Sequence, residues 1–299
     1  MQRGKQSMPE FRTLLSEGTQ TLKKAGIEEA ALDAWLLLEY VSGRNRAWYY
    51  AHDTEEAPGE TERKYRTLCE RRADHVPLQH LTHRAFFMEY EFYVDEHVLI
   101  PRQDTETLTE LAGELLADMA SPVILDMCTG SGCILISLLA AKKDCTGVGC
   151  DISPKALAVA MRNAVSIGVE ERAYFTESDL FSGMMFQEKD GKAPQKYDML
   201  VSNPPYIPTE EIGGLMEEVR LHDPVLALDG GGAGLYFYRE ITRNAPQYLR
   251  PGGWLLFEIG CDQGRDVAGM MERAGFADVE VKRDLAGLDR VALGRLPSR

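Results

Sequence analysis

The sequence contains no run of about 18 apolar residues, so it predicts no helix that spans a membrane. The segment Met1 to Glu10 is polar and lacks the apolar core of a secretory signal, and we therefore expect a cytoplasmic protein. The six cysteines form no C-x-x-C pair, which argues against a zinc site. His75, His80 and His83 lie close together but lack a cysteine or carboxylate signature beside them, so we expect no metal.

Basic residues are outnumbered by acidic ones, 33 against 47, and the formal net charge is −14. A protein that binds duplex nucleic acid usually carries a basic face, so this balance argues against a DNA or RNA partner, although it does not exclude a local basic patch. Hydrophobic residues make up 44% of the chain and charged residues 27%, which is an ordinary globular composition. A length of 299 residues fits one large domain with an appendage, or two domains.

The N-terminal part of the chain is predicted to be a small helical bundle covering residues 1–85. Apolar residues recur at helical spacing from Phe11 to Leu22 and again from Ala31 to Tyr40, where Gly43 is a plausible stop. A third, more charged helix is expected from about Glu60 to Arg72. No catalytic signature falls in this region, and an amphipathic bundle of this size is either a substrate-docking module or a structural cap.

Residues 86–101 are predicted to form a β-hairpin that links this bundle to the rest of the chain. Aromatic and β-branched residues occur on both sides of Asp95-Glu96-His97, which we interpret as the polar turn. A helix is expected to open after Pro101, capped by Asp104 or Thr105, and to run to about Met119. Arg102 lies between a strand end and this helix start, so it is a candidate residue of a substrate cleft.

Residues 102–299 alternate between short apolar runs and helical segments, which is typical of an α/β fold with a doubly wound, mostly parallel sheet. Seven strands are expected, and they are Val123–Met127, Thr146–Asp151, Ala173–Glu177, Tyr197–Ser202, Gly253–Ile259, Val279–Arg283 and Arg290–Leu293. The polar stretch Gln187 to Gln195 is expected to be an exposed turn.

The fourth of these strands runs directly into Asn203-Pro204-Pro205-Tyr206. Proline fixes φ, lacks an N–H and keeps the residue before it out of the helical region, so Asn203 is expected to be extended at the carboxyl end of the strand. Ligands of open α/β sheets bind at that edge. The Asn203 side-chain oxygen and a proline carbonyl are two acceptors for a planar –NH2 group, and Tyr206 offers a flat face for it. The structural alternative is a stiff loop with a buried tyrosine.

The first strand of the sheet is followed by a tight glycine turn, Cys128, Thr129, Gly130, Ser131 and Gly132. This turn does not meet the G-x-G-x-x-G dinucleotide pattern and has no lysine for phosphates, so a nucleoside without phosphates fits better. Asp151 ends the second strand, where a carboxylate accepts from ribose hydroxyls, and Asp179 follows the third, where an adenine edge would lie. Helix capping is the alternative role for both acids. S-adenosylmethionine is a ligand of the required kind.

At these residues the chain resembles the class I S-adenosylmethionine-dependent methyltransferases, which have a Rossmann-like fold. More closely, it resembles the family that methylates the glutamine side-chain amide of peptide chain release factors, and the similarity covers nearly the whole chain. The segments that carry the resemblance are 98–102, 104–106, 125–132, 201–208, 218–220, 234–238, 258–260 and 263–264.

The resemblance implies S-adenosylmethionine as cofactor, a release factor as protein partner in translation termination, and the glutamine of its GGQ motif as the methylated residue. It places the cofactor loop on Cys128, Thr129, Gly130, Ser131 and Gly132, the ribose acid on Asp151, and adenine-side contacts on Asp179 and Leu180. Asn203, Pro204, Pro205 and Tyr206 are implied as the catalytic, glutamine-binding residues, with Asn203 also beside the cofactor.

The chain departs from the family pattern at three places. Cys128 and His83 stand where glycine is more usual, and Leu221-His222-Asp223-Pro224 replaces a more acidic segment. Two other functions stay open. Amino-group methyltransferases of DNA or RNA share the Asn203 to Tyr206 tetrad and act on a flipped or single-stranded base. A non-catalytic binding protein can also keep the fold.

Overall fold

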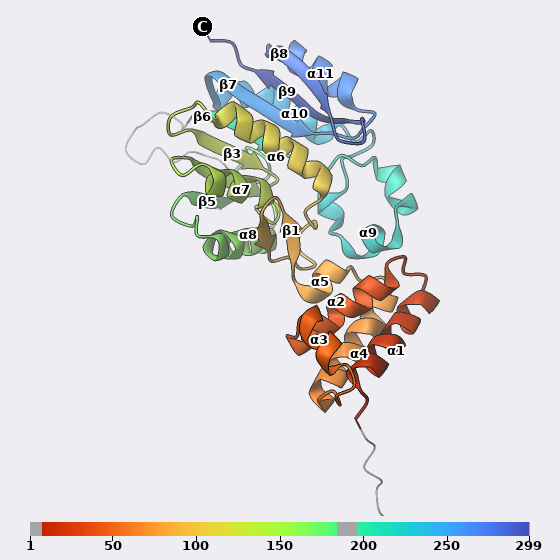
Figure 1. Cartoon of the computed structure of the whole chain (residues 1–299). Coiled ribbons are helices and arrows are strands. Elements are labelled where there is room, and N and C mark those ends of the chain that lie inside the picture. Colours follow the sequence, from red (N-terminus) through yellow and green to blue (C-terminus); the bar gives the residue numbers. More distant parts are fainter. Residues whose placement is uncertain (1–7, 184–195, 299) are drawn as a thin grey trace, which may run out of the picture. The chain divides into compact units, whose positions relative to one another are not determined.

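The computed structural model describes residues 8–183 and 196–298 (Figure 1). These residues divide into two compact units. The first unit contains residues 8–83 and the later segment Met216–His222, and the second contains the remaining described residues. No helix in the described ranges has the length and apolar character to cross a membrane. The stretch Gln187 to Gln195, expected to be a turn, lies outside the described residues.

The first unit is helical. Its helices are α1 (Phe11–Lys24), α2 (Ala30–Ser42), α3 (Arg46–His52), α4 (Gly59–Ala73), α5 (Leu78–Thr82) and α9 (Glu217–His222). Apolar residues from α1, α2 and α4, among them Leu14, Leu37 and Tyr65, form one buried cluster. Helices α1, α2 and α4 confirm the three helices predicted from apolar periodicity. The short helices α3 and α5 were not predicted.

The hairpin that follows is formed by β1 (Ala85–Phe87) and β2 (Tyr90–Phe92), which pair antiparallel. A hairpin was predicted here, but the predicted turn at Asp95-Glu96-His97 was wrong. The chain turns at Met88, whose φ is 52° and whose N–H donates to Oε1 of Glu106 over 2.5 Å. Because a long-range hydrogen bond holds this left-handed residue, the turn has no signature in the local sequence.

Helix α6 (Gln103–Leu116) begins one residue after Arg102, which is its N-cap and makes no side-chain capping bond. The predicted caps, Asp104 and Thr105, instead lie inside the first turn. Their side chains are therefore available for tertiary contacts. The acidic residues of this first turn, Asp104 and Glu106, match the positive end of the helix dipole, as expected.

The second unit is built on a seven-stranded sheet of order β5-β4-β3-β6-β7-β9-β8. Its strands are β3 (Val123–Met127), β4 (Thr146–Asp151), β5 (Ala173–Glu177), β6 (Tyr197–Ser202), β7 (Leu249–Glu258), β8 (Ala277–Arg283) and β9 (Asp289–Arg295). All adjacent pairs from β5 to β7 are parallel, and β9 runs antiparallel to both β7 and β8. The doubly wound, mostly parallel sheet predicted from the sequence is thus confirmed.

Helices cover both faces of this sheet (Figure 1). They are α6, α7 (Cys133–Ala141), α8 (Pro154–Ile167), α10 (Tyr236–Asn244) and α11 (Gly264–Arg273), and three short 3-10 helices, η1 (Thr209–Gly214), η2 (Val225–Ala227) and η3 (Ala245–Gln247), lie in the connections. Successive strand residues point to opposite faces, so Ile124 packs in the cluster of α6 and α7, whereas Leu125 packs in that of α10 and α11.

Local sequence explains where the helices beside the site begin and end. Ser153 caps α8 by accepting from the N–H of Ala156, and Pro154 occupies the first turn, where its missing N–H has no cost. Gly168 ends the helix in the left-handed conformation, with φ 78°. The chain is thereby returned to β5, so that β4 and β5 end side by side.

Candidate active site

A cavity of about 300 Å³ lies in the second unit at the carboxyl ends of β3, β4, β5 and β6. It is lined by the turn after β3, by Asp151 to Ser153 after β4, by Ser178 to Leu180 after β5, and by Asn203 and Pro205 after β6. Residues from four parallel strand ends therefore meet around one space, as the open-sheet rule predicts. The volume lies at the lower end of the range for small-molecule sites, roughly 300–1,000 Å³.

The glycine turn after β3 contains left-handed backbone conformations, which residues with a side chain rarely adopt. Gly130 and Gly132 have φ of 53° and 80°, and Cys128 has φ of 61° although it carries a side chain. A Cβ at Gly132 would lie 2.7 Å from Cδ1 of Ile136 and 3.2 Å from Cβ of Ala160, so the Ile136 side chain would have to shift. Cys128 adopts a left-handed conformation that glycine takes more easily than a residue with a side chain. Cys128, Thr129, Gly130 and Ser131 line the cavity, whereas Gly132 supports the turn as N-cap of α7.

Below this turn lies Asp126, a fully buried carboxyl on β3. Its Oδ2 accepts a hydrogen bond of 2.6 Å from the Thr129 hydroxyl. Burial raises the pKa of Asp126 to about 7, against the opposing effect of the Thr129 hydrogen bond. Asp126 was not singled out from the sequence. A single acid in an apolar strand carries no sequence signature that tells a structural role from ligand binding.

Asp151 closes the second strand and faces the cavity. Its Oδ2 accepts from the N–H of Gly130 and its Oδ1 from the N–H of Ser153, both over 2.9 Å. Burial raises the pKa of this carboxyl, and the backbone N–H groups oppose that change. Each oxygen keeps a further lone pair, so the carboxylate is both fixed in orientation and able to accept from a ligand's hydroxyls.

Asp179 and Leu180, which were predicted to contact the adenine, also line the cavity. Leu180 has φ of 49°, and its carbonyl accepts a hydrogen bond of 2.5 Å from the Ser178 hydroxyl. Leu180 also packs on the apolar cluster that contains Met127 and Leu125. This loop is therefore held on both sides, and it presents one acid and one apolar surface to the cavity.

The Asn203 to Tyr206 tetrad is divided between the cavity and the protein interior. Asn203 and Pro205 line the cavity, whereas Pro204 and Tyr206 do not. The side-chain NH2 of Asn203 donates to the Thr105 hydroxyl oxygen over 3.2 Å. The Tyr206 ring belongs to the edge of an apolar cluster, and its hydroxyl donates to Oε1 of Glu258 over 3.2 Å.

Arg102 lines the cavity as predicted, and it has a fixed partner. Its guanidinium forms an ion pair of 2.7 Å with the carboxylate of Asp223. The Asp223 side chain is only 1% exposed, against 43% for Arg102. Sequence reasoning grouped Asp223 among the departures from the family pattern and did not predict this pairing.

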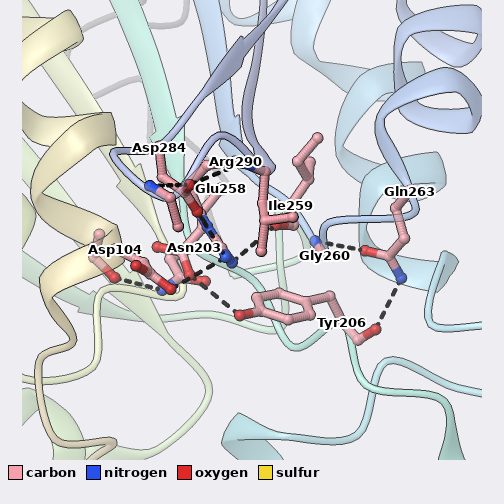
Figure 2. Close-up of polar contacts among 12 residues, drawn as sticks. Asp104, Asn203, Tyr206, Glu258, Ile259, Gly260, Gln263, Asp284 and Arg290 are labelled. Atoms are coloured by element: carbon pink, nitrogen blue, oxygen red, sulfur yellow. Dashed lines mark hydrogen bonds and ion pairs between the residues drawn. The ribbon is translucent and has the colours of Figure 1, made fainter.

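Behind the tetrad lies a cluster of charged and polar side chains (Figure 2). Arg290 on β9 forms ion pairs of 3.1 Å with Asp104 of α6 and with Asp284. Glu258, at the end of β7, is 2% exposed and lies next to this cluster. Burial raises the pKa of Glu258, while the Thr105 hydroxyl, Arg290 and Tyr206 act to lower it. This cluster was missed at the sequence level, where Glu258 contributed only to the family resemblance.

Comparison with solved structures finds a protein of similar fold. The hMettl16 catalytic domain, solved in complex with an RNA hairpin, aligns with 70% of this chain and 75% of its own, with 15% identity and a TM-score of 0.50. That likeness concerns the fold alone. Two family descriptions match the sequence, the PrmC N-terminal domain over residues 13–82 and the methyltransferase small domain over residues 103–233.

The particular family follows from full-length relatives. The release factor glutamine methyltransferase of Cereibacter sphaeroides is 42% identical over 93% of this chain and 95% of its own length. The protein of that name from Geobacter sulfurreducens is 40% identical, over 92% and 93% respectively. The chain therefore belongs to the release factor glutamine methyltransferase family, and the resemblance inferred from its motifs is confirmed. The roles of the individual site residues stay predictions.

Proposed function

We propose that this protein uses S-adenosylmethionine to methylate the side-chain amide nitrogen of a glutamine in a peptide chain release factor, the glutamine of its GGQ motif. Family membership supports the reaction, and one observation supports it most directly. Asn203, the residue suited to hold a carboxamide, lines the same cavity as Asp151 and the glycine turn, the residues suited to hold the cofactor.

The cavity residues fit S-adenosylmethionine. The turn from Cys128 to Ser131 brings backbone close to the ligand, and the carboxylate of Asp151, fixed by two backbone N–H groups, is placed to accept from the ribose hydroxyls. Asp179 and Leu180 are assigned to the adenine, whose exocyclic amine needs an acceptor and whose ring needs an apolar surface. When bound, this cofactor would supply a methyl group on a sulfonium; a nitrogen nucleophile takes the methyl and gives up a proton, and the thioether is the leaving group.

The tetrad would hold the glutamine amide. Because the NH2 of Asn203 donates to Thr105, the Asn203 oxygen is left as the acceptor for one substrate N–H. We assign the other substrate N–H to the Pro204 carbonyl. The Tyr206 ring is not part of the cavity wall, so we expect it to support the cradle from the side.

An amide nitrogen is a weak nucleophile because its lone pair is delocalised into the carbonyl. Two fixed acceptors orient the nitrogen toward the methyl group and stabilise the positive charge that develops on it, so positioning and preorganised dipoles supply most of the rate enhancement. The chain needs no covalent intermediate for this chemistry. Arg102, held by Asp223 at the edge of the cavity, is assigned to substrate binding.

The helical first unit is assigned to docking of the release factor. Residues 13–82 match the PrmC N-terminal domain, and no catalytic signature falls within them. Hydrogen–deuterium exchange with and without a release factor tests this assignment. Protection of amides within residues 8–83 supports docking there, and protection confined to residues 84–298 contradicts it.

Incubation with radiolabelled S-adenosylmethionine and, in separate reactions, a release factor, DNA or RNA tests the function. Label is expected on the release factor alone, and on none when its GGQ glutamine is replaced. The tetrad is shared with nucleic-acid amino-methyltransferases, so label on DNA or RNA would establish that second function instead. If none of the three is labelled, the remaining alternative is a non-catalytic binding protein.

A further inference from the structure

Asn163, on helix α8, bonds two segments of the chain that are distant in sequence and lead to different walls of the cavity. The residue is 0% exposed. Its Oδ1 accepts from the Tyr93 N–H over 2.8 Å, and its NH2 donates to the Tyr93 carbonyl over 3.0 Å. The same NH2 donates to the Ser131 carbonyl over 2.9 Å. Only one orientation of the amide satisfies these three backbone groups, so the orientation of Asn163 is fixed.

The first of these segments begins at Tyr93, directly after β2. The Asn163 amide bonds both backbone groups of Tyr93, as a residue of a neighbouring strand would. Further along this segment, residues 97–102 line the cavity. The segment also packs on α8 through one apolar cluster, which contains Val94, Val98, Ile100, Ala156 and Val159. Apolar contact is not directional, so the hydrogen bonds at Tyr93 determine where the segment lies along the helix.

The second segment is the glycine turn, in which Ser131 lines the cavity. The peptide group between Ser131 and Gly132 is fixed at both ends. Its carbonyl accepts from Asn163, and its N–H donates to the Thr129 carbonyl over 2.8 Å. Asn163 therefore fixes the direction of a backbone carbonyl in the cavity wall, and it ties that wall to Tyr93.

The contacts of Asn163 require one acceptor and two donors on a short side chain. Aspartate has the same shape, but its carboxyl group offers one donor when protonated and none when ionised, so it cannot satisfy both carbonyls. Serine is too short to reach all three backbone groups. Asparagine is also a poor helix former, which shows that these long-range contacts outweigh helix propensity at position 163.

We propose that Asn163 is a positioning residue for cofactor binding. By bonding Tyr93 and Ser131 at once, it holds the segment 97–102 and the glycine turn at the separation that S-adenosylmethionine requires. This inference rests on the proposed function, and within it on S-adenosylmethionine as the ligand of the cavity. It assigns part of the cofactor affinity to a residue that does not line the cavity.

Isothermal titration calorimetry on Asn163→Asp tests the proposal. The dissociation constant of S-adenosylmethionine is expected to rise about tenfold to a hundredfold, the effect of one or two net hydrogen bonds. Asn163→Ser, which puts no carboxyl group against the two carbonyls, is expected to weaken binding less. At saturating cofactor, kcat should stay within about threefold of the wild type, because Asn203 bonds Thr105 and none of these residues. A loss of affinity with little loss of kcat separates cofactor positioning from a part in the chemistry.

Arg172→Met is the matched control. Nη1 of Arg172 also donates to two backbone carbonyls of the same unit, those of Lys142 and Cys145, over 3.1 and 2.9 Å. None of these three residues lines the cavity. The control should lose stability in urea unfolding and keep its dissociation constant within about twofold of the wild type. A purely structural role for Asn163 predicts this same result for Asn163→Asp.

A measurement on the wild type covers the case in which the Asn163 variants do not fold. The chain has four asparagines, so selective ¹⁵N-asparagine labelling gives few side-chain NH2 signals, and replacing the other three in turn assigns that of Asn163. S-adenosylmethionine is expected to shift the Asn163 signal, because the Ser131 carbonyl that it bonds is in the cavity wall. The Asn244 signal should not shift, since its NH2 donates to the Glu240 carbonyl within α10.

The outcomes distinguish this inference from the proposed function. A raised dissociation constant in Asn163→Asp alone supports the inference, even if the wild type methylates no release factor, which overturns the proposed function. A wild type that does methylate a release factor, with an unchanged dissociation constant in Asn163→Asp, overturns the inference alone. An equal rise in Arg172→Met, or an Asn163 signal that the cofactor does not shift, also overturns it. A wild type that binds no S-adenosylmethionine overturns both.

Discussion

The guanidinium of Arg102 and the carboxylate of Asp223 form an ion pair of 2.7 Å, although 121 positions separate them in the chain. Arg102 is the N-cap of α6 and Asp223 directly precedes the segment that contributes Pro224 to the cavity wall. The pair therefore joins the start of α6 to the rim of the site. Its two members are unequally exposed, which determines how each responds to substitution.

Arg102→Met is expected to lower the free energy of unfolding by about 1–3 kcal/mol, because the Asp223 charge stays buried without the Arg102 cation. Asp223→Asn is expected to cost less, since Arg102 is 43% exposed and its charge returns to water. The double variant should be more stable than Arg102→Met alone. Urea unfolding of the four proteins measures this, and additive losses would contradict a coupled pair.

Asp151→Asn is expected to weaken S-adenosylmethionine binding about tenfold to a hundredfold, the loss of one charge-assisted hydrogen bond to a ribose hydroxyl. Asparagine keeps the shape but accepts from only one of the Gly130 and Ser153 N–H groups, because its NH2 faces the other, so part of the loss comes from the turn. Isothermal titration calorimetry gives the dissociation constant. An unchanged constant in a folded variant would remove Asp151 from the cofactor site.

Asp126 is expected to make the folded state less stable as pH rises. The folded protein holds the Asp126 proton up to a pKa of about 7, whereas the usual value is 3.8. Between these two values the folded state binds more protons than the unfolded state, so the contribution of Asp126 is greatest below pH 4 and is lost as pH rises through about 7.

Asp126→Asn should remove this pH dependence of stability. The difference in unfolding free energy between variant and wild type should therefore change steadily between about pH 4 and pH 7. Urea unfolding at a series of pH values measures it. Asp144→Asn is the control, because hydrogen bonding lowers the pKa of Asp144 and its titration lies below the range. Parallel stability curves for wild type and Asp126→Asn would show that burial does not raise this pKa.

Arg72 is expected to hold the segment Met216–His222 in the helical unit. Its side chain, 7% exposed, forms ion pairs of 2.7 Å with Asp33 and 2.6 Å with Glu218. Arg72→Met leaves the buried Asp33 carboxylate without this cation and should cost about 3 kcal/mol. Hydrogen exchange should also quicken at residues 216–222.

Arg66→Met provides the matched control on the same helix. Arg66 also pairs with two carboxylates, those of Glu17 and Glu62, but its side chain is 45% exposed. Exposed pairs contribute at most about 1 kcal/mol, so little change is expected. Similar losses in the Arg66 and Arg72 variants would mean that burial does not set the strength of these ion pairs.

Much of the second unit was predictable because its signals are local. A parallel strand covered on both faces is a short apolar run, and the glycine turn and Ser153-Pro154 mark where helices begin. The hairpin turn was misplaced for the opposite reason. Met88 is left-handed and its N–H bonds Glu106, a residue of the next helix, and no local pattern encodes that bond.

In the site, too, some residues were predictable from the sequence and others were not. Asp151, Asp179 and Asn203 follow successive parallel strands, so their meeting at one edge of the sheet follows from topology. Thr105 was expected to cap α6, but the helix begins earlier and its hydroxyl turns to Asn203 instead. The contacts of Thr105 and Glu258 depend on burial and on long-range partners, which residue order alone does not reveal.

The central claim is that Asn203 holds the substrate amide beside the cofactor. The most direct measurement compares wild type and Asn203→Ala for methyl transfer to a release factor, with cofactor binding followed by calorimetry. The account predicts that the variant binds S-adenosylmethionine within about threefold of the wild type and loses about a hundredfold or more in kcat. Full turnover by Asn203→Ala would contradict it.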